Sequence, residues 1–143
     1  MAERLMAHAL AAEDPPLRDL EVTSAGLSAM PGQPASANAV AALKKVGLSL
    51  EDFRSQPFDQ SILHRSTAIF CMTESHRNLI ELHFENPSTP VYLVREFVPG
   101  GDTQIPDPFG MDFRAYEAAR DSIVEAIPSL LDKLRSMDFP RSS

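Results

Sequence analysis

Cys71 and Arg77 are a pair whose residue types and spacing suggest chemistry. The spacing Cys-x5-Arg is that of a phosphate-binding loop, in which a thiolate is the nucleophile and a guanidinium holds the anion. A loop whose N–H groups converge on one anion needs glycine, and this segment contains none. Glu74 would add a negative charge, and Cys71 ends an apolar run typical of a buried strand. We therefore interpret Cys71 as a core residue.

Asp107 is a second candidate, because it lies between Pro106 and Pro108. Two prolines stiffen the loop, which suits a proton donor that must meet a leaving group accurately. A surface turn without a catalytic role explains the same residues, and composition alone favours that interpretation. Phe109 is suited either to stack on a substrate or to pack under the loop. Ser24, at the end of a short predicted strand, has the alternative role of a strand-end cap.

Alternating helices and strands must position these residues. The pattern predicts strands over 20–24, 67–72 and 90–94, with Ser36 and Thr73 as N-caps of the two middle helices. A helix runs to about Ala12, one turn is predicted at 59–63, and the last helix starts at 113 after a Gly- and Pro-rich loop. This order indicates an α/β fold with a parallel sheet covered on both faces. We expect one domain over 1–137 and a flexible tail over 138–143.

Composition narrows the possible partners and location. The chain has 143 residues, with 20 Asp and Glu against 13 Lys and Arg and a formal net charge of -7. This balance argues against sequence-independent binding of nucleic acid or of anionic membranes. A single cysteine cannot form an internal disulfide, and zinc-ligand spacing is absent, so we expect no metal and no cofactor. The chain contains no apolar stretch of membrane-spanning length, and we expect a cytoplasmic protein.

Six segments, spread from Met1 to about Leu134, resemble motifs of the low-molecular-weight protein tyrosine phosphatase family in order and spacing. The family includes bacterial protein-arginine phosphatases and related arsenate reductases. Each motif alone is weak, whereas the ordered set is specific. The matching segments are Thr23-Ser24-Ala25-Gly26-Leu27, Pro34-Ala35-Ser36, Arg54-Ser55, Cys71-Met72-Thr73 with His76, Arg95-Glu96-Phe97, and Asp107-Pro108-Phe109-Gly110.

The resemblance implies a three-layer α/β/α fold with strand order 2-1-3-4, and a bacterial hydrolase. It also implies hydrolysis of phosphotyrosine or phosphoarginine in proteins, or of small phosphoesters, through a phosphocysteine intermediate. In this scheme Asp107 is the general acid, Phe109 lines the pocket mouth, and Ser24 helps to brace the phosphate loop. The single cysteine excludes a multi-cysteine arsenate relay. Phosphotyrosine and phosphoarginine both remain as alternative substrates, and Met111 after Gly110 slightly favours the arginine-phosphatase branch.

In the family, a hydrophobic strand and a Cys-x5-Arg loop precede the residues that match Met1-Ala2-Glu3. We therefore expect the first, central strand, the nucleophile and the arginine to be missing from these residues. The chain as given should be inactive and should self-associate through exposed strand edges. Three explanations stay open: a start assigned too late in a full phosphatase, a noncatalytic pseudophosphatase that acts as a binding module, or a nonfunctional fragment.

Overall fold

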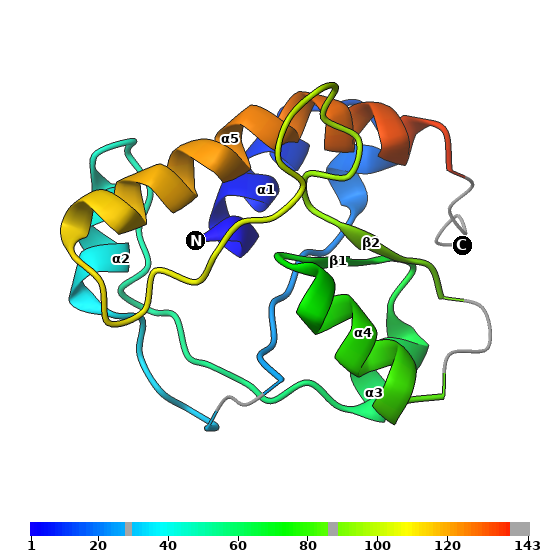
Figure 1. The fold of residues 1–143 in the computed structure, drawn as a ribbon. Coiled ribbons are helices and arrows are strands. Elements are labelled where there is room, and N and C mark those ends of the chain that lie inside the picture. The colour runs from blue at the N-terminus through cyan, green and yellow to red at the C-terminus, as the bar shows by residue number, and fades with distance from the viewer. Residues whose placement is uncertain (28–29, 86–88, 138–143) are drawn as a thin grey trace.

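The computed structural model describes residues 1–27, 30–85 and 89–137, so the expected tail over 138–143 lies outside the described residues. Figure 1 shows α1, α2 and α5 on one side of the two strands and α3 and α4 on the other. This arrangement confirms the α/β class. The elements in chain order are α1 (Ala2–Ala11), the short 3-10 helix η1 (Leu17–Asp19), α2 (Ala37–Lys44), α3 (Gln60–Arg65), β1 (Ile69–Cys71), α4 (Glu74–His83), β2 (Val91–Leu93) and α5 (Phe113–Arg135).

Helix starts follow the capping residues. A side-chain oxygen accepts a backbone N–H of the first turn in four helices, which satisfies one of the orphan donors there. The caps predicted at Ser36 and Thr73 are confirmed, and the turn predicted at 59–63 is the helix α3. The four capping residues are Ser36 for α2, Asp59 for α3, Thr73 for α4 and Asp112 for α5.

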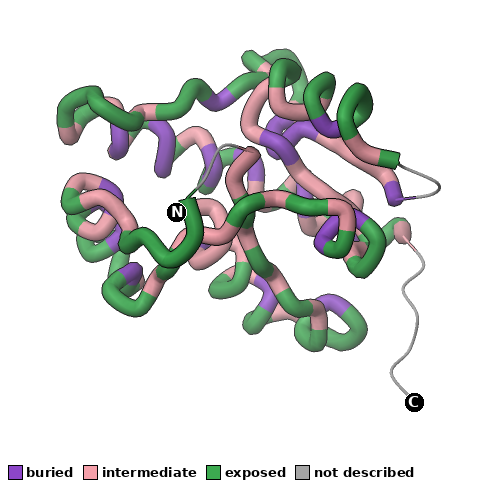
Figure 2. The backbone as a smooth tube through the Cα atoms, turned by 90° about the horizontal axis from the view of Figure 1, so that it is seen from below, coloured by how far each residue is buried: buried purple, intermediate pink, exposed green. Residues whose placement is uncertain are grey.

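The main apolar core lies where α1, α2 and α5 pack together. Leu43 of α2 and Ala126 of α5 are fully buried in it, and Leu5 of α1 belongs to the same cluster. Figure 2 shows that buried positions recur along the helices between exposed ones, as expected for amphipathic helices. Arg120 of α5 is also buried and donates from Nη1 to the carbonyl of Ala42 at 2.9 Å. Among the described residues, no helix has the length and apolar character needed to cross a membrane.

The strand predicted over 20–24 is wrong, because these residues have no ladder partner. The parallel sheet contains β1 and β2, with Ile69 opposite Val91. The carbonyl of Ser24 accepts instead from Nε2 of Gln56 at 2.8 Å. Close by, Gly26 forms an isolated parallel bridge with Pro57, so the hydrogen bonds of this part of the chain run to residues 56–57. A strand exists only through its neighbours, and none of the described segments pairs with 20–24.

One edge of β1 is open in the described part of the chain. Ile69 donates to Pro90 at 3.0 Å, and Cys71 accepts from Val94 at 2.8 Å, so both residues face β2. Alternate residues of a parallel strand direct their backbone groups to opposite edges, and Phe70 therefore faces away from β2. None of the described strands pairs with that side. The missing first and central strand expected from the sequence stays a prediction.

The open edge predicts concentration-dependent association of residues 1–143. An unpaired strand edge carries free N–H and C=O groups, and such edges recruit strands from other chains. Sedimentation velocity should therefore show an average mass that rises with protein concentration. A monomer across the whole concentration range would contradict this expectation.

Candidate functional site

Asp107 lies in the connection between β2 and α5, with its side chain available to solvent. Its Oδ1 accepts the backbone N–H of Phe109 at 3.0 Å, which holds the carboxylate in its own turn. The Phe109 side chain is 79% exposed and does not pack under the loop. An accessible carboxylate and an adjacent exposed ring are thus presented together. This arrangement is compatible with a proton donor and a stacking surface for a substrate.

The loop that carries Asp107 is anchored at the carboxyl end of β1. The Ile105 side chain is buried, and its N–H donates to the Met72 carbonyl at 2.9 Å. Oε1 of Gln104 accepts the N–H of Glu74, the first residue of α4, at 3.1 Å. Sites in parallel α/β sheets form beyond the carboxyl ends of the strands. Asp107 follows the Ile105 anchor by two residues and is therefore positioned at this end of the sheet.

The start of α1 belongs to the same neighbourhood. Met1 packs on the apolar cluster that contains Ile105 and also includes Met72 at its margin. The helix has no side-chain cap, and its first backbone bond runs from Leu5 to Met1 at 3.1 Å. Uncapped N–H groups and the helix dipole favour an anion at such an end. Burial lowers the pKa of the Met1 α-amino group, because desolvation disfavours its charged form, while the charge of Glu3 opposes the shift.

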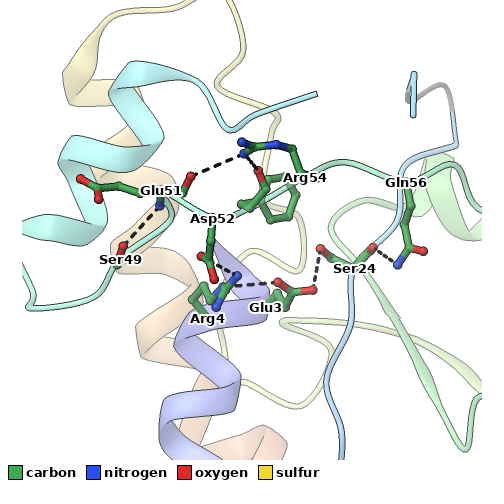
Figure 3. Close-up of polar contacts among 9 residues, drawn as sticks. Glu3, Arg4, Ser24, Ser49, Glu51, Asp52, Arg54 and Gln56 are labelled. Carbon is green, nitrogen blue, oxygen red and sulfur yellow. Dashed lines mark hydrogen bonds and ion pairs between the residues drawn. The ribbon is translucent and has the colours of Figure 1, made fainter. Parts of the chain in front are cut away.

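Ser24 contacts the first turn of α1, as Figure 3 shows. Its Oγ donates to Oε1 of Glu3 at 3.2 Å, and Gln56 holds its carbonyl. Arg4 then pairs with Glu3 at 3.5 Å and with Asp52 at 3.1 Å, which links this turn to the 51–56 loop. Ser24 therefore braces the start of α1, whereas its predicted role beside a phosphate loop stays a prediction.

The Cys71–Arg77 segment does not form a phosphate loop, which confirms our interpretation of Cys71. Cys71 is 6% exposed, and burial raises the pKa of its thiol to about 11 although the charge of Arg77 opposes the shift. Arg77 lies within α4 and pairs with Glu96 at 2.7 Å and Glu74 at 2.8 Å. Both terminal nitrogens of the Arg77 guanidinium are thus paired with carboxylates. Cys71 is not suited to act as a nucleophile at neutral pH.

Sequence reasoning did not identify the residues that anchor the Asp107 loop and the Ser24 segment. Gln104 and Gln56 contact segments about 30 residues away in the chain, and no local pattern marks such contacts. The buried side chain of Ile105 was also overlooked, because a single apolar residue in a loop has no periodicity. Arg95 belongs to the matching segment Arg95-Glu96-Phe97, but the sequence does not indicate its partner Glu125.

We predict that Cys71 reacts slowly with iodoacetamide in the folded chain. With a pKa of about 11 the thiolate fraction at pH 8 is ~10⁻³, against about a quarter for an ordinary thiol. Alkylation followed by mass spectrometry should be ~100-fold slower in buffer than in urea, and the rate in buffer should still rise between pH 8 and pH 10. Equal rates in the two solvents would show that the thiol is accessible and ordinary.

Comparisons with known proteins place the chain in one family. The family model of low molecular weight phosphotyrosine protein phosphatase matches residues 1–138. A protein-arginine-phosphatase of Geobacillus stearothermophilus is 34% identical over 124 residues, which are 87% of this chain and 83% of that protein. The solved YwlE arginine phosphatase from the same organism has a TM-score of 0.81 and 31% identity, and the match covers 94% of this chain and 83% of that one.

A second solved structure has the same fold. The low molecular weight protein tyrosine phosphatase from T. tengcongensis has a TM-score of 0.81 and 28% identity, and the match covers 92% of this chain and 88% of that one. The ordered motifs and the α/β fold agree with these similarities. The chain belongs to the low molecular weight phosphotyrosine protein phosphatase family.

Proposed function

We propose that this domain hydrolyses phosphorylated protein side chains with Asp107 as the general acid. The observation that carries the proposal is the anchoring of the Asp107 loop by Ile105 to the Met72 carbonyl at 2.9 Å. This contact holds an accessible carboxylate beyond the end of β1, and the uncapped start of α1 packs on the same apolar cluster as Ile105. A positioned acid accelerates cleavage because it neutralises the leaving group as the bond breaks.

The proposed reaction has two steps. A cysteine thiolate attacks phosphorus, the bond from phosphorus to the leaving oxygen or nitrogen breaks, and Asp107 donates its proton to the leaving atom. Water then attacks the phosphocysteine, gives a proton to Asp107, and the sulfur–phosphorus bond breaks to release phosphate. Phe109 offers an exposed ring for a phenol or a guanidinium. Phosphoarginine is the first substrate to test, because the relatives described above include arginine phosphatases.

The thiolate must come from outside the 143 residues, because Cys71 is their one cysteine and is buried. We propose that a strand followed by a Cys-x5-Arg loop joins the domain ahead of Met1, as the late-start explanation requires. Within the described residues no strand pairs with the edge of β1 at Phe70, so that edge offers a place for such a strand. We refer below to the chain preceded by this strand and loop as the completed form.

We predict that purified residues 1–143 do not hydrolyse an aryl phosphate or a phosphoarginine peptide above the buffer rate. Cys71 is buried, and the burial raises its pKa, so the one thiol of the chain is not poised to attack phosphorus. Phosphate release should be measured with and without vanadate. Vanadate-sensitive turnover that disappears in Cys71→Ser would contradict our interpretation of this residue.

A noncatalytic binding module is the second candidate, favoured by the lack of an accessible thiol within these residues. It predicts that residues 1–143 bind a phosphopeptide with a measurable affinity although they do not turn it over. The phosphatase proposal requires the completed form for both binding and turnover. Calorimetric titration of one phosphopeptide into both forms separates the two candidates.

In the completed form, we predict that Asp107→Asn lowers turnover by ~10²–10⁴-fold, the usual contribution of a positioned acid. The loss should be greatest for substrates with poor leaving groups, because good leaving groups need little protonation. Steady-state kinetics on a series of aryl phosphates tests this dependence.

Asp112→Asn is the matched control for this experiment. Asp112 lies near Asp107 in sequence but caps α5, and asparagine is an equally good cap, so this variant should keep the parent activity. A similar loss for good and poor leaving groups in Asp107→Asn would mean that Asp107 is structural.

A further inference from the structure

We propose that Arg95 is the positioning residue for Asp107, and that it acts by holding the first half of the acid loop against α5. The inference rests on the proposed function, in which Asp107 is the general acid. Arg95 follows β2 by two residues, and the loop that it holds runs from Pro99 to Gly110.

All three nitrogens of the Arg95 guanidinium are engaged. Nε donates to the Asp102 carbonyl of the loop at 2.7 Å, while Nη1 donates to the Ser122 carbonyl of α5 at 2.9 Å. Nη2 pairs with Oε1 of Glu125 at 2.9 Å. The arginine is 6% exposed, so these partners replace the water that it has lost. One buried cation therefore joins the loop to α5.

Gly101 shows how closely the loop lies on this guanidinium. A Cβ atom at this position would lie 2.9 Å from Nη2 of Arg95, which is closer than real Cβ contacts. A larger residue would have to displace a group that is already fixed by its hydrogen bonds. Glycine therefore allows the backbone of the loop to rest directly on Arg95.

A continuous series of contacts leads from Arg95 to Asp107. Asp102, whose carbonyl Arg95 holds, accepts the Gln104 N–H on its own Oδ1 at 3.0 Å. Gln104 in turn contacts the start of α4, and Ile105 bonds to Met72. Asp107 is separated from Ile105 only by Pro106, whose fixed φ limits the freedom of the last step. Loss of the Arg95 contacts should therefore make the position of Asp107 less well ordered.

The turn that carries Arg95 is fixed from the opposite side. The neighbouring Glu96 accepts from Arg77 of α4 at 2.7 Å and from the backbone N–H of Leu93 at 3.3 Å. Arg95 and Glu96 thus connect the end of β2 to α5 and to α4 respectively. A lysine at position 95 has one terminal nitrogen and cannot reproduce the planar, three-way geometry. It would leave part-buried acceptors without donors.

The first test measures order in the loop of the 143-residue chain. We compare Arg95→Lys with Arg120→Lys, because Arg120 is similarly buried at 9% exposed and donates to the distant Ala42 carbonyl of α2. Amide hydrogen exchange of Ile105 is measured against that of Val94, whose bond to Cys71 reports on the sheet. Arg95→Lys should accelerate the amide exchange of Ile105 relative to that of Val94 by ~10-fold. Arg120→Lys should leave the ratio of the two exchange rates unchanged.

Gly101→Ala provides a second variant, which displaces Nη2 but keeps the charge of Arg95. It should change the same exchange ratio in the same direction as Arg95→Lys, even where Arg95→Lys lowers the overall stability. An equal effect of Arg95→Lys and Arg120→Lys on the ratio, or no effect of either position-95 or position-101 variant, would overturn the proposal.

The second test measures turnover in the completed form. Arg95→Lys should reduce turnover ~10-fold for poor leaving groups and less for good ones, and should add nothing in an Asp107→Asn background. Arg120→Lys should show no dependence on the leaving group. Equal losses for all leaving groups, or full additivity with Asp107→Asn, would overturn the positioning role. Failure of the proposed function is detected separately, by an Asp107→Asn variant whose loss does not depend on the leaving group.

Discussion

The backbone hydrogen bonds at the carboxyl end of β1 are the constraint on which the rest of the structure depends. The Cys71 carbonyl accepts from Val94 at the end of β2, and the next carbonyl, that of Met72, accepts from Ile105 in the Asp107 loop. Thr73 then caps α4. Three consecutive residues thus position the neighbouring strand, the candidate acid loop and the helix on the other face. Because buried carbonyls cannot remain unpaired without cost, these positions are coupled.

Two buried arginines extend this order to the long helix α5. Arg120 joins α5 to the end of α2, and Arg95 joins it to the loop that leads to Asp107. Each donates to a backbone carbonyl of another element and also contacts a carboxylate of α5. Because carbonyl acceptors carry no net charge, the positive charge of each buried arginine is compensated only in part, by its exposed carboxylate partner. The planar geometry of the guanidinium groups, more than their net charge, therefore determines how Arg95 and Arg120 connect these elements.

The same strand that organises the site is also incomplete on its other side. Phe70 faces an edge without a strand partner in the described residues, and the segment over 20–24 contacts Gln56 and not β1. The loop that carries Asp107 is anchored through Ile105 to the Met72 carbonyl, and in our proposal it positions a proton donor. The one thiol, Cys71, is enclosed in the apolar core of the sheet. In our proposal Asp107 donates the proton, and a thiolate other than that of Cys71 attacks phosphorus.

Features that depend on contacts between neighbouring residues can be predicted from the sequence. Ser36 and Thr73 mark helix starts because a cap bonds within its own turn, and the apolar run before Cys71 predicts a buried strand and an inert thiol. Only the tertiary structure decided that 20–24 is not a strand, since a strand requires a partner that is distant in sequence. It alone also decided that Ser24 contacts Glu3 and that Arg95 holds Asp102 and Ser122. Long-range hydrogen bonds have no local signature, because their partners come together only when the whole chain packs.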